Sequence, residues 1–96
     1  MRLRIHPDAS AEIEREAQYY EGQAPGLGLA FLDEVDFYVE RIFEAPMQYR
    51  EVETGIRKCV LEQFPFTIRF RVSDGLVEIL VVRHDARSDE FGQERY

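Results

Sequence analysis

The side chains best suited to chemistry are four arginines and a histidine in the second half of the chain. They are Arg69, Arg71, Arg83, His84 and Arg87. Guanidinium groups can stabilise the charge that develops on a phosphate during phosphodiester cleavage, while an imidazole can donate or accept the proton. Tyr96 is a second side chain that could carry a proton. The set would suit a nuclease site, with His84 as acid or base, if the fold brought these groups together.

The same residues also have a structural interpretation. In the run FPFTIRFRV, Arg69 and Arg71 alternate with three apolar residues, so a strand with one solvated face would account for both arginines. A lone histidine such as His84 is more often structural than catalytic. The spacing therefore leaves three roles open for these side chains, namely catalysis, partner binding and a solvated strand face.

Two amphipathic helices are predicted in the first half of the chain. Apolar residues recur at spacings of three and four in residues 8–22, and a broad apolar stripe runs through residues 27–45 with acidic residues opposite it. The turn-forming sequence GQAPGLG separates the two segments, and Pro46 ends the second. We therefore expect an antiparallel helical hairpin.

Four strands are predicted around this hairpin. They cover about residues 2–6, 56–62, 67–72 and 76–83. Ser73-Asp74-Gly75 suits a hairpin turn between the last two, and the run ILVV is apolar on both parities, as in a central strand covered on both faces. The order of elements predicts a single α+β domain over residues 1–96. We expect the helices on one face of the sheet, with the other face partly open.

Charge divides along the chain, whose net charge is −7. Residues 8–53 carry three basic and twelve acidic side chains, whereas residues 1–7 and 54–84 together carry seven basic and three acidic ones. Because neighbouring residues of a strand face opposite sides, the basic side chains should gather on the open face of the sheet. They are Arg2, Arg4, Arg69, Arg71 and one of Arg57 and Lys58.

Several classes of protein do not fit the sequence. No apolar run approaches the roughly 18 residues of a membrane span, and the start MRLRIHPD lacks the apolar part of a secretory signal. Cys59 is the single cysteine and suits the core of a strand, while no Cys/His cluster has metal-ligand spacing. We therefore expect a cytoplasmic protein with no membrane contact, no metal and no other cofactor.

Four segments carry a family resemblance: AQYYEGQAPGLGLAFLDEV, then Pro46 followed by YREV and GIRK, then FPFTIRFRV, and finally EILVVRHDAR. Together, in this order, they resemble the RelE/ParE superfamily of toxins from bacterial type II toxin–antitoxin modules. The resemblance runs from about Ile5 to Arg87 and is nearer to the ParE-like, plasmid-stabilisation branch. It implies a helical hairpin packed on an antiparallel sheet, which agrees with the periodicities.

The resemblance also implies a function. A cognate antitoxin would neutralise the chain by folding its disordered C-terminal segment onto the hairpin and the sheet. ParE-like members inhibit DNA gyrase, whereas RelE-like members cut messenger RNA in the ribosome. We expect gyrase inhibition, in which no residue acts as a catalyst. The alternatives are a ribosome-dependent mRNA endoribonuclease that uses the arginines and His84, and a non-toxic remnant that still binds antitoxin.

Two features depart from the family pattern. The chain contains no tryptophan, and Gly92 stands about where many ParE-like chains have one. Toxins of this family are usually basic, whereas this chain has a net charge of −7. Acidic charge weighs against ribosomal RNA as a target more than against a protein target.

The predicted partner contacts combine exposed aromatic residues with the basic strand residues. Phe37 falls on the acidic side of the second helix, outside its apolar stripe, and one of Tyr19 and Tyr20 should be exposed. The predicted partner-binding residues are Phe37, Tyr19, Arg57, Lys58, Arg69 and Arg71. Their partner would be the antitoxin, gyrase or a second copy of the chain, so a homodimer and a hetero-oligomer with antitoxin both remain open.

Overall fold

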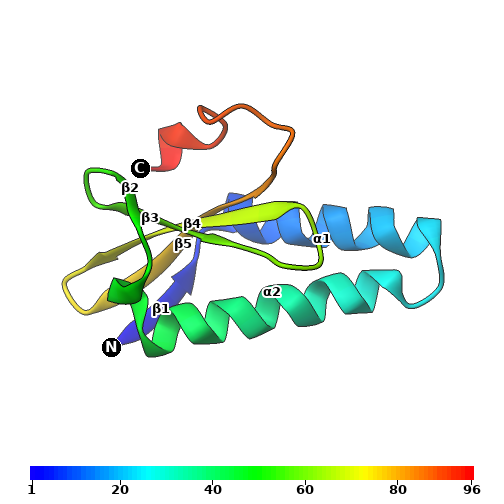
Figure 1. Cartoon of the computed structure of the whole chain (residues 1–96), viewed down its shortest axis with the longest axis horizontal. Coiled ribbons are helices and arrows are strands. Elements are labelled where there is room, and N and C mark those ends of the chain that lie inside the picture. The colour runs from blue at the N-terminus through cyan, green and yellow to red at the C-terminus, as the bar shows by residue number, and fades with distance from the viewer.

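Two helices lie on one face of a five-stranded sheet in the computed structural model, which describes residues 1–96 (Figure 1). The elements are β1 (Arg2–Ile5), α1 (Pro7–Gln23), α2 (Leu27–Glu44), β2 (Glu51–Glu53), β3 (Ile56–Val60), β4 (Phe66–Ser73) and β5 (Leu76–His84), with 3₁₀ turns η1 (Pro46–Gln48) and η2 (Gln93–Arg95). The predicted α+β class, the helical hairpin and its place on one face of the sheet are confirmed.

The two helices approach closely at their joined end because glycine occupies the contact. A Cβ atom on Gly28 would lie 2.5 Å from the carbonyl oxygen of Ala17, so any larger side chain would push the helices apart. The carboxylate of Glu21 accepts hydrogen bonds from the backbone amides of Gly26 and Gly28, at 3.1 and 3.0 Å to Oε1. These bonds satisfy amides at the start of α2, which has no side-chain cap at Gly26.

The strand order in the sheet is β1-β5-β4-β3-β2. β4 and β5 form the predicted antiparallel hairpin, in which Asp74 and Gly75 take φ values of 51° and 74°, as a two-residue turn of type I′ requires. Two features were missed by the sequence analysis. β1 pairs with β5 in parallel, and the short strand β2 extends the sheet beyond β3.

The main core lies between the helices and the sheet, and aromatic rings join the two layers. The ring of Phe31 on α2 lies 5.0 Å from that of Phe66 on β4 and 5.3 Å from that of Phe64. Tyr20 on α1 adds an edge contact to Phe64 at 4.9 Å. Full burial of one such side chain contributes roughly 1.5–3 kcal/mol, so this cluster fixes the position of the hairpin on the sheet.

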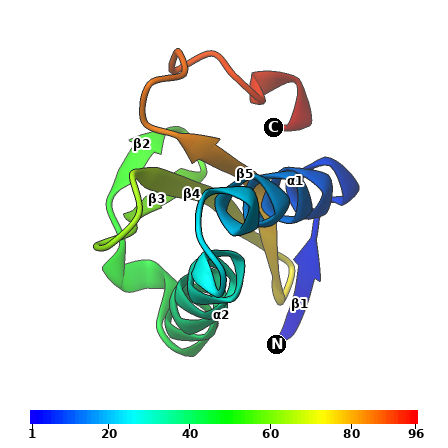
Figure 2. The same ribbon diagram turned by 90° about the vertical axis from the view of Figure 1, so that its right-hand side faces the viewer.

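The other face of the sheet is covered by residues 85–96, here called the C-terminal segment. Phe91 and Tyr96 of this segment pack on a second apolar cluster made of Ile56, Leu80 and Val81. Figure 2 shows the segment on the side of the sheet away from α2. The expected central strand is confirmed, because β5 lies between β1 and β4 and buries residues on both faces. The expectation of a partly open basic face is wrong where the segment covers it.

Local backbone features explain how this second layer forms. The β4–β5 register shifts between Arg69 and Phe70, and Leu80 is the unpaired residue of β5, so both Leu80 and Val81 join the second cluster. Gly92 sits directly against the sheet with φ 85°, and a Cβ atom there would lie 2.5 Å from a methyl carbon of Val81. A tryptophan at this position would be incompatible with the path of the segment.

Candidate functional site

Two of the predicted site arginines are buried beneath the C-terminal segment. The side chains of Arg69 and Arg83 are each only 7% exposed. Nη1 of Arg69 donates to the Tyr96 hydroxyl at 3.2 Å, and Nη1 of Arg83 donates to the carbonyl oxygen of Ser88 at 3.0 Å. Both guanidiniums face the same oxygen, Oδ1 of Asp89, at 3.6 and 3.4 Å. These arginines are therefore internal to an ion-pair cluster in the free chain.

Further along the same face, basic residues share one acidic partner. Glu78 on β5 pairs with Arg4 of β1 and with Nη2 of Arg71, the latter at 3.1 Å. The other terminal nitrogen of Arg71 contacts the backbone oxygen of Tyr96. Arg71 is thus half-buried between the segment and the sheet, and its charge is balanced within the molecule.

The pairing of β3 with β4 shows which of Arg57 and Lys58 lies on the basic face of the sheet. Lys58 is the partner of Arg69, so it lies on the face that the C-terminal segment covers. Arg57 is the partner of Phe70 and lies on the helix side, where its Nη1 donates to the carbonyl oxygen of Tyr49 at 2.7 Å. Lys58 therefore joins the basic cluster, and Arg57 occupies a structural contact at the sheet edge.

His84 lies on the side of the sheet opposite to the buried arginines. It is the register partner of Phe66, whose ring centroid is 5.1 Å from its own, and it lines a cleft beside Tyr20 on α1. Its Nδ1 accepts a hydrogen bond from the backbone amide of Ala86. The structure thus separates the imidazole from Arg69, Arg71 and Arg83 by the thickness of the sheet. The remaining residues predicted for a nuclease site are Arg87 and Tyr96.

Neither of these two restores an acid–base pair to the arginine cluster. Arg87 is exposed and stacks on the ring of Phe91, with its guanidinium carbon 4.9 Å from the centroid. Tyr96 is the only predicted proton carrier that touches Arg69, through its hydroxyl. The proposed nuclease set is not assembled in one place.

A second ion pair, which was not predicted from the sequence, holds the C-terminal segment. Nη2 of Arg95 lies 2.6 Å from Oε2 of Glu12 on α1, and the two side chains are 8% and 5% exposed. Glu12 also accepts a hydrogen bond from the backbone amide of Val82, and Arg95 donates to the carbonyl oxygen of Leu80. The hydrogen bond to Glu12 raises the pKa of Arg95, so the guanidinium stays charged. No periodicity in the sequence signals such a long-range contact.

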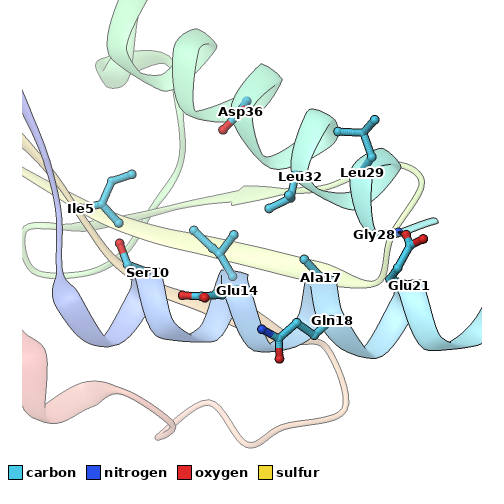
Figure 3. Close-up of a pocket in the computed structure, with 11 residues that line it drawn as sticks. Ile5, Ser10, Glu14, Ala17, Gln18, Glu21, Gly28, Leu29, Leu32 and Asp36 are labelled. Atoms are coloured by element: carbon cyan, nitrogen blue, oxygen red, sulfur yellow. Dashed lines mark hydrogen bonds between the residues drawn. The ribbon is translucent and has the colours of Figure 1, made fainter. Parts of the chain in front are cut away.

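A groove of about 510 Å³ runs along the helical hairpin, between α1 and α2 (Figure 3). Its apolar lining comes from both helices and from β1: Ile5, Ile13, Ala17, Leu29 and Leu32. Glu14, Glu21 and Asp36 also line it, so acidic side chains accompany the apolar ones. Leu29 is 62% exposed, which is unusual for a large apolar side chain inside a groove. The groove has the composition of a binding site for a segment with apolar and basic residues.

The exposed aromatic residues lie elsewhere on the hairpin. Tyr19 is exposed and Tyr20 packs in the main core, which confirms the expected division between them. Phe37 is also exposed, with the guanidinium of Arg41 5.4 Å from its ring centroid. Cys59 is buried as expected, and burial raises the pKa of its thiol to about 11, which makes it a poor nucleophile. Partner binding by Tyr19 and Phe37 stays a prediction.

Comparison with known proteins matches the chain to a family model, to curated relatives and to a solved structure. The model of a family described as the ParE toxin of the type II toxin–antitoxin system parDE matches residues 3–89. Toxin ParE2 of Mycobacterium tuberculosis is 29% identical over 84 residues, which are 86% of this chain and 80% of that protein, in strains H37Rv and CDC 1551 alike. A solved chain from the chromosomal ParDE TA system of P. aeruginosa has a TM-score of 0.78 at 23% identity, over 88% of this chain and 95% of that chain.

Proposed function

Since the chain belongs to the ParE toxin family of type II toxin–antitoxin systems, we propose that it stops growth by inhibiting DNA gyrase until a cognate antitoxin binds it. The observation that carries this proposal is the family match, which extends over residues 3–89 and so includes both long helices and all or most of every strand. Both the target and the antitoxin would be met in the cytoplasm. None of the helices has the length and apolar content that a membrane span needs.

The hairpin groove is the surface that we propose for the antitoxin. An incoming segment could bury apolar side chains against Ile13, Leu29 and Leu32, while basic side chains pair with Glu14 and Asp36 at the sides. A segment that is disordered when free would gain its order from this burial. The acidic character of residues 8–53 then has a role, because it attracts a basic antitoxin segment.

The placement of His84 favours gyrase inhibition over RNA cleavage. A nuclease needs a general acid and a general base within reach of the scissile phosphate, together with cations for the developing charge. Here the imidazole and the buried guanidiniums of Arg69 and Arg83 lie on opposite faces of the sheet. A target bound through surface contacts alone requires no such convergence, and this agrees with a toxin that holds an enzyme without breaking a bond.

Induced expression in a bacterial host tests the toxin and its antitoxin surface together. We expect growth arrest by the chain alone and normal growth when the antitoxin is co-expressed. Leu29→Arg should still arrest growth but escape neutralisation, because the new cation pairs with the groove carboxylates and fills the apolar site; antitoxin affinity should fall about tenfold or more. Met47→Arg, at an exposed position outside the groove, is the matched control.

Two outcomes would contradict this proposal in different ways. Unimpeded growth with soluble, folded chain would support a remnant that has lost toxicity. Normal neutralisation of Leu29→Arg would show that the antitoxin uses a surface other than the hairpin groove.

A further inference from the structure

The two buried guanidiniums beneath the C-terminal segment lack a well-made anionic partner. The carboxylate oxygens around Arg69 and Arg83 lie 3.4 to 3.6 Å from them, on Asp89 and Glu53. Charge-assisted hydrogen bonds between nitrogen and oxygen are normally about 2.7–2.9 Å long. Nε of Arg69 and Nε of Arg83 have no hydrogen-bond partner although both are buried. Two buried cations are thus incompletely compensated.

The same molecule shows that this fold can build a tight buried pair. Arg95 is equally buried, and although its Nε also lacks a partner, its Nη2 meets Glu12 at 2.6 Å. The difference lies in the acid, because the Glu12 side chain is 5% exposed whereas the Asp89 side chain is 86% exposed. Asp89 therefore reaches the two guanidiniums from the solvent side, through a single oxygen. Such an acid can be replaced by an external anion without unfolding the core.

A polar cleft leads to this cluster from the side of β2. It has a volume of about 560 Å³, and Lys58, Arg69, Glu53 and Asp89 are among its lining residues. Arg50 and Glu51 also line it, so the lining holds three cations and three carboxylates, and Arg83 lies beside them through its contact with Asp89. Displacement of Asp89 would leave four cations and two carboxylates in this region, although the chain has a net charge of −7. An anion is the ligand that such a cleft would attract.

We propose that Arg69 and Arg83 form a binding site for a phosphate group that carries about two negative charges, and that Asp89 occupies this site as an internal ligand. A phosphate monoester or inorganic phosphate carries roughly −1.5 to −2 charge near neutral pH and has at least three acceptor oxygens. It can therefore satisfy two guanidiniums at once, which the single oxygen of Asp89 does at long distance. Lys58 in the cleft adds a third cation.

Occupation of the site has a consequence for the C-terminal segment. The phosphate displaces Asp89, while Arg95 and the packing of Gly92 on Val81 keep their contacts with the rest of the chain. The part of the segment around Ser88 and Asp89 then moves away from the cleft. The site thus couples a phosphate-bearing ligand to the exposure of Arg69 and Arg83, and this holds whether or not the chain inhibits gyrase.

Nuclear magnetic resonance of the arginine Nε–H groups tests the proposal on the purified chain. Inorganic phosphate is titrated into the protein, with phosphoserine as a monoester and with acetate and chloride at equal ionic strength. We expect saturable shifts of the Arg69 and Arg83 Nε–H signals with phosphate and phosphoserine and weak ones with acetate or chloride. Asp89→Asn should bind phosphate roughly fivefold more tightly, because it removes the competing carboxylate. Glu90→Gln, which makes the same charge change one residue away, should bind like the unaltered chain.

The proposal fails if Asp89→Asn and Glu90→Gln have the same phosphate affinity, or if chloride reproduces the phosphate shifts. Arg83→Gln should abolish the shifts at Arg69. If that variant does not fold, the comparison of the two acidic variants still decides, because both change exposed side chains.

Discussion

Two ion-pair clusters anchor the same C-terminal segment to the rest of the molecule, and they differ in how their acids are placed. Glu12 and Arg95 are both buried, with side-chain atoms 2.6 Å apart, and Glu12 also accepts a hydrogen bond from the backbone amide of Val82. Asp89 is exposed and contacts Arg69 and Arg83 at 3.4 to 3.6 Å. The first cluster joins the segment to α1, whereas the second joins it to the basic face of the sheet.

Burial of the acidic side chain decides what role an ion pair can have in the molecule. When both charges are buried, loss of one leaves the other uncompensated in a poorly hydrated site, so the pair acts as a structural anchor. When the acid remains in water, it can leave its partners at little cost and another anion can take its place. We expect the fold to depend on the first cluster and the function of the basic face to depend on the second.

The largest expected effect comes from removal of the buried acid. Glu12→Ala leaves the Arg95 guanidinium and the Val82 amide without their acceptor, so the free energy of unfolding should fall by about 3–5 kcal/mol. Urea denaturation followed by circular dichroism measures this loss. Glu14→Ala, on the groove side of α1, is the control and should change stability by less than about 0.5 kcal/mol. Equal losses in the two variants would contradict the assigned role of Glu12.

A much smaller effect is expected at the exposed acid. Asp89→Asn should lower the free energy of unfolding by at most about 1 kcal/mol, because its pairs are long and solvated. The loss should shrink further in 1 M salt, where charges are screened beyond about 3 Å. The loss in Glu12→Ala should persist at that salt concentration. A large, salt-independent loss in Asp89→Asn would remove the distinction between the two clusters.

Those parts of the fold that are encoded within a short run of residues could be predicted from the sequence, whereas contacts between distant residues could not. Helical spacing placed α1 and α2, and the Asp74–Gly75 turn placed the β4–β5 hairpin, because each of these is encoded within a short run of residues. The parallel pairing of β1 with β5 was missed, since it joins residues about seventy positions apart. The C-terminal segment was also missed. It has no periodic pattern, and its fit to the sheet depends on Gly92, whose role appears only in three dimensions.

Some features of the candidate site could likewise be predicted from neighbouring residues, whereas others depend on contacts between distant residues. Arg83 and His84 are neighbours in a strand, so their opposite orientation could have been derived from the sequence, and the nuclease set could have been questioned there. Burial of Arg69 could not have been foreseen, because its partners Asp89, Glu53 and Tyr96 come from distant parts of the chain. The choice of Lys58 over Arg57 needed the register of β3 against β4, which a single sequence does not fix.

The central claim is that the chain is a toxin that inhibits gyrase by binding and breaks no bond itself. The most direct measurement is DNA supercoiling by purified gyrase with increasing amounts of the purified chain, alongside translating ribosomes treated identically. We predict that supercoiling is inhibited, that His84→Ala inhibits it to the same extent, and that messenger RNA stays intact. Unaffected supercoiling together with cleaved messenger RNA, and loss of that cleavage in His84→Ala, would contradict the claim.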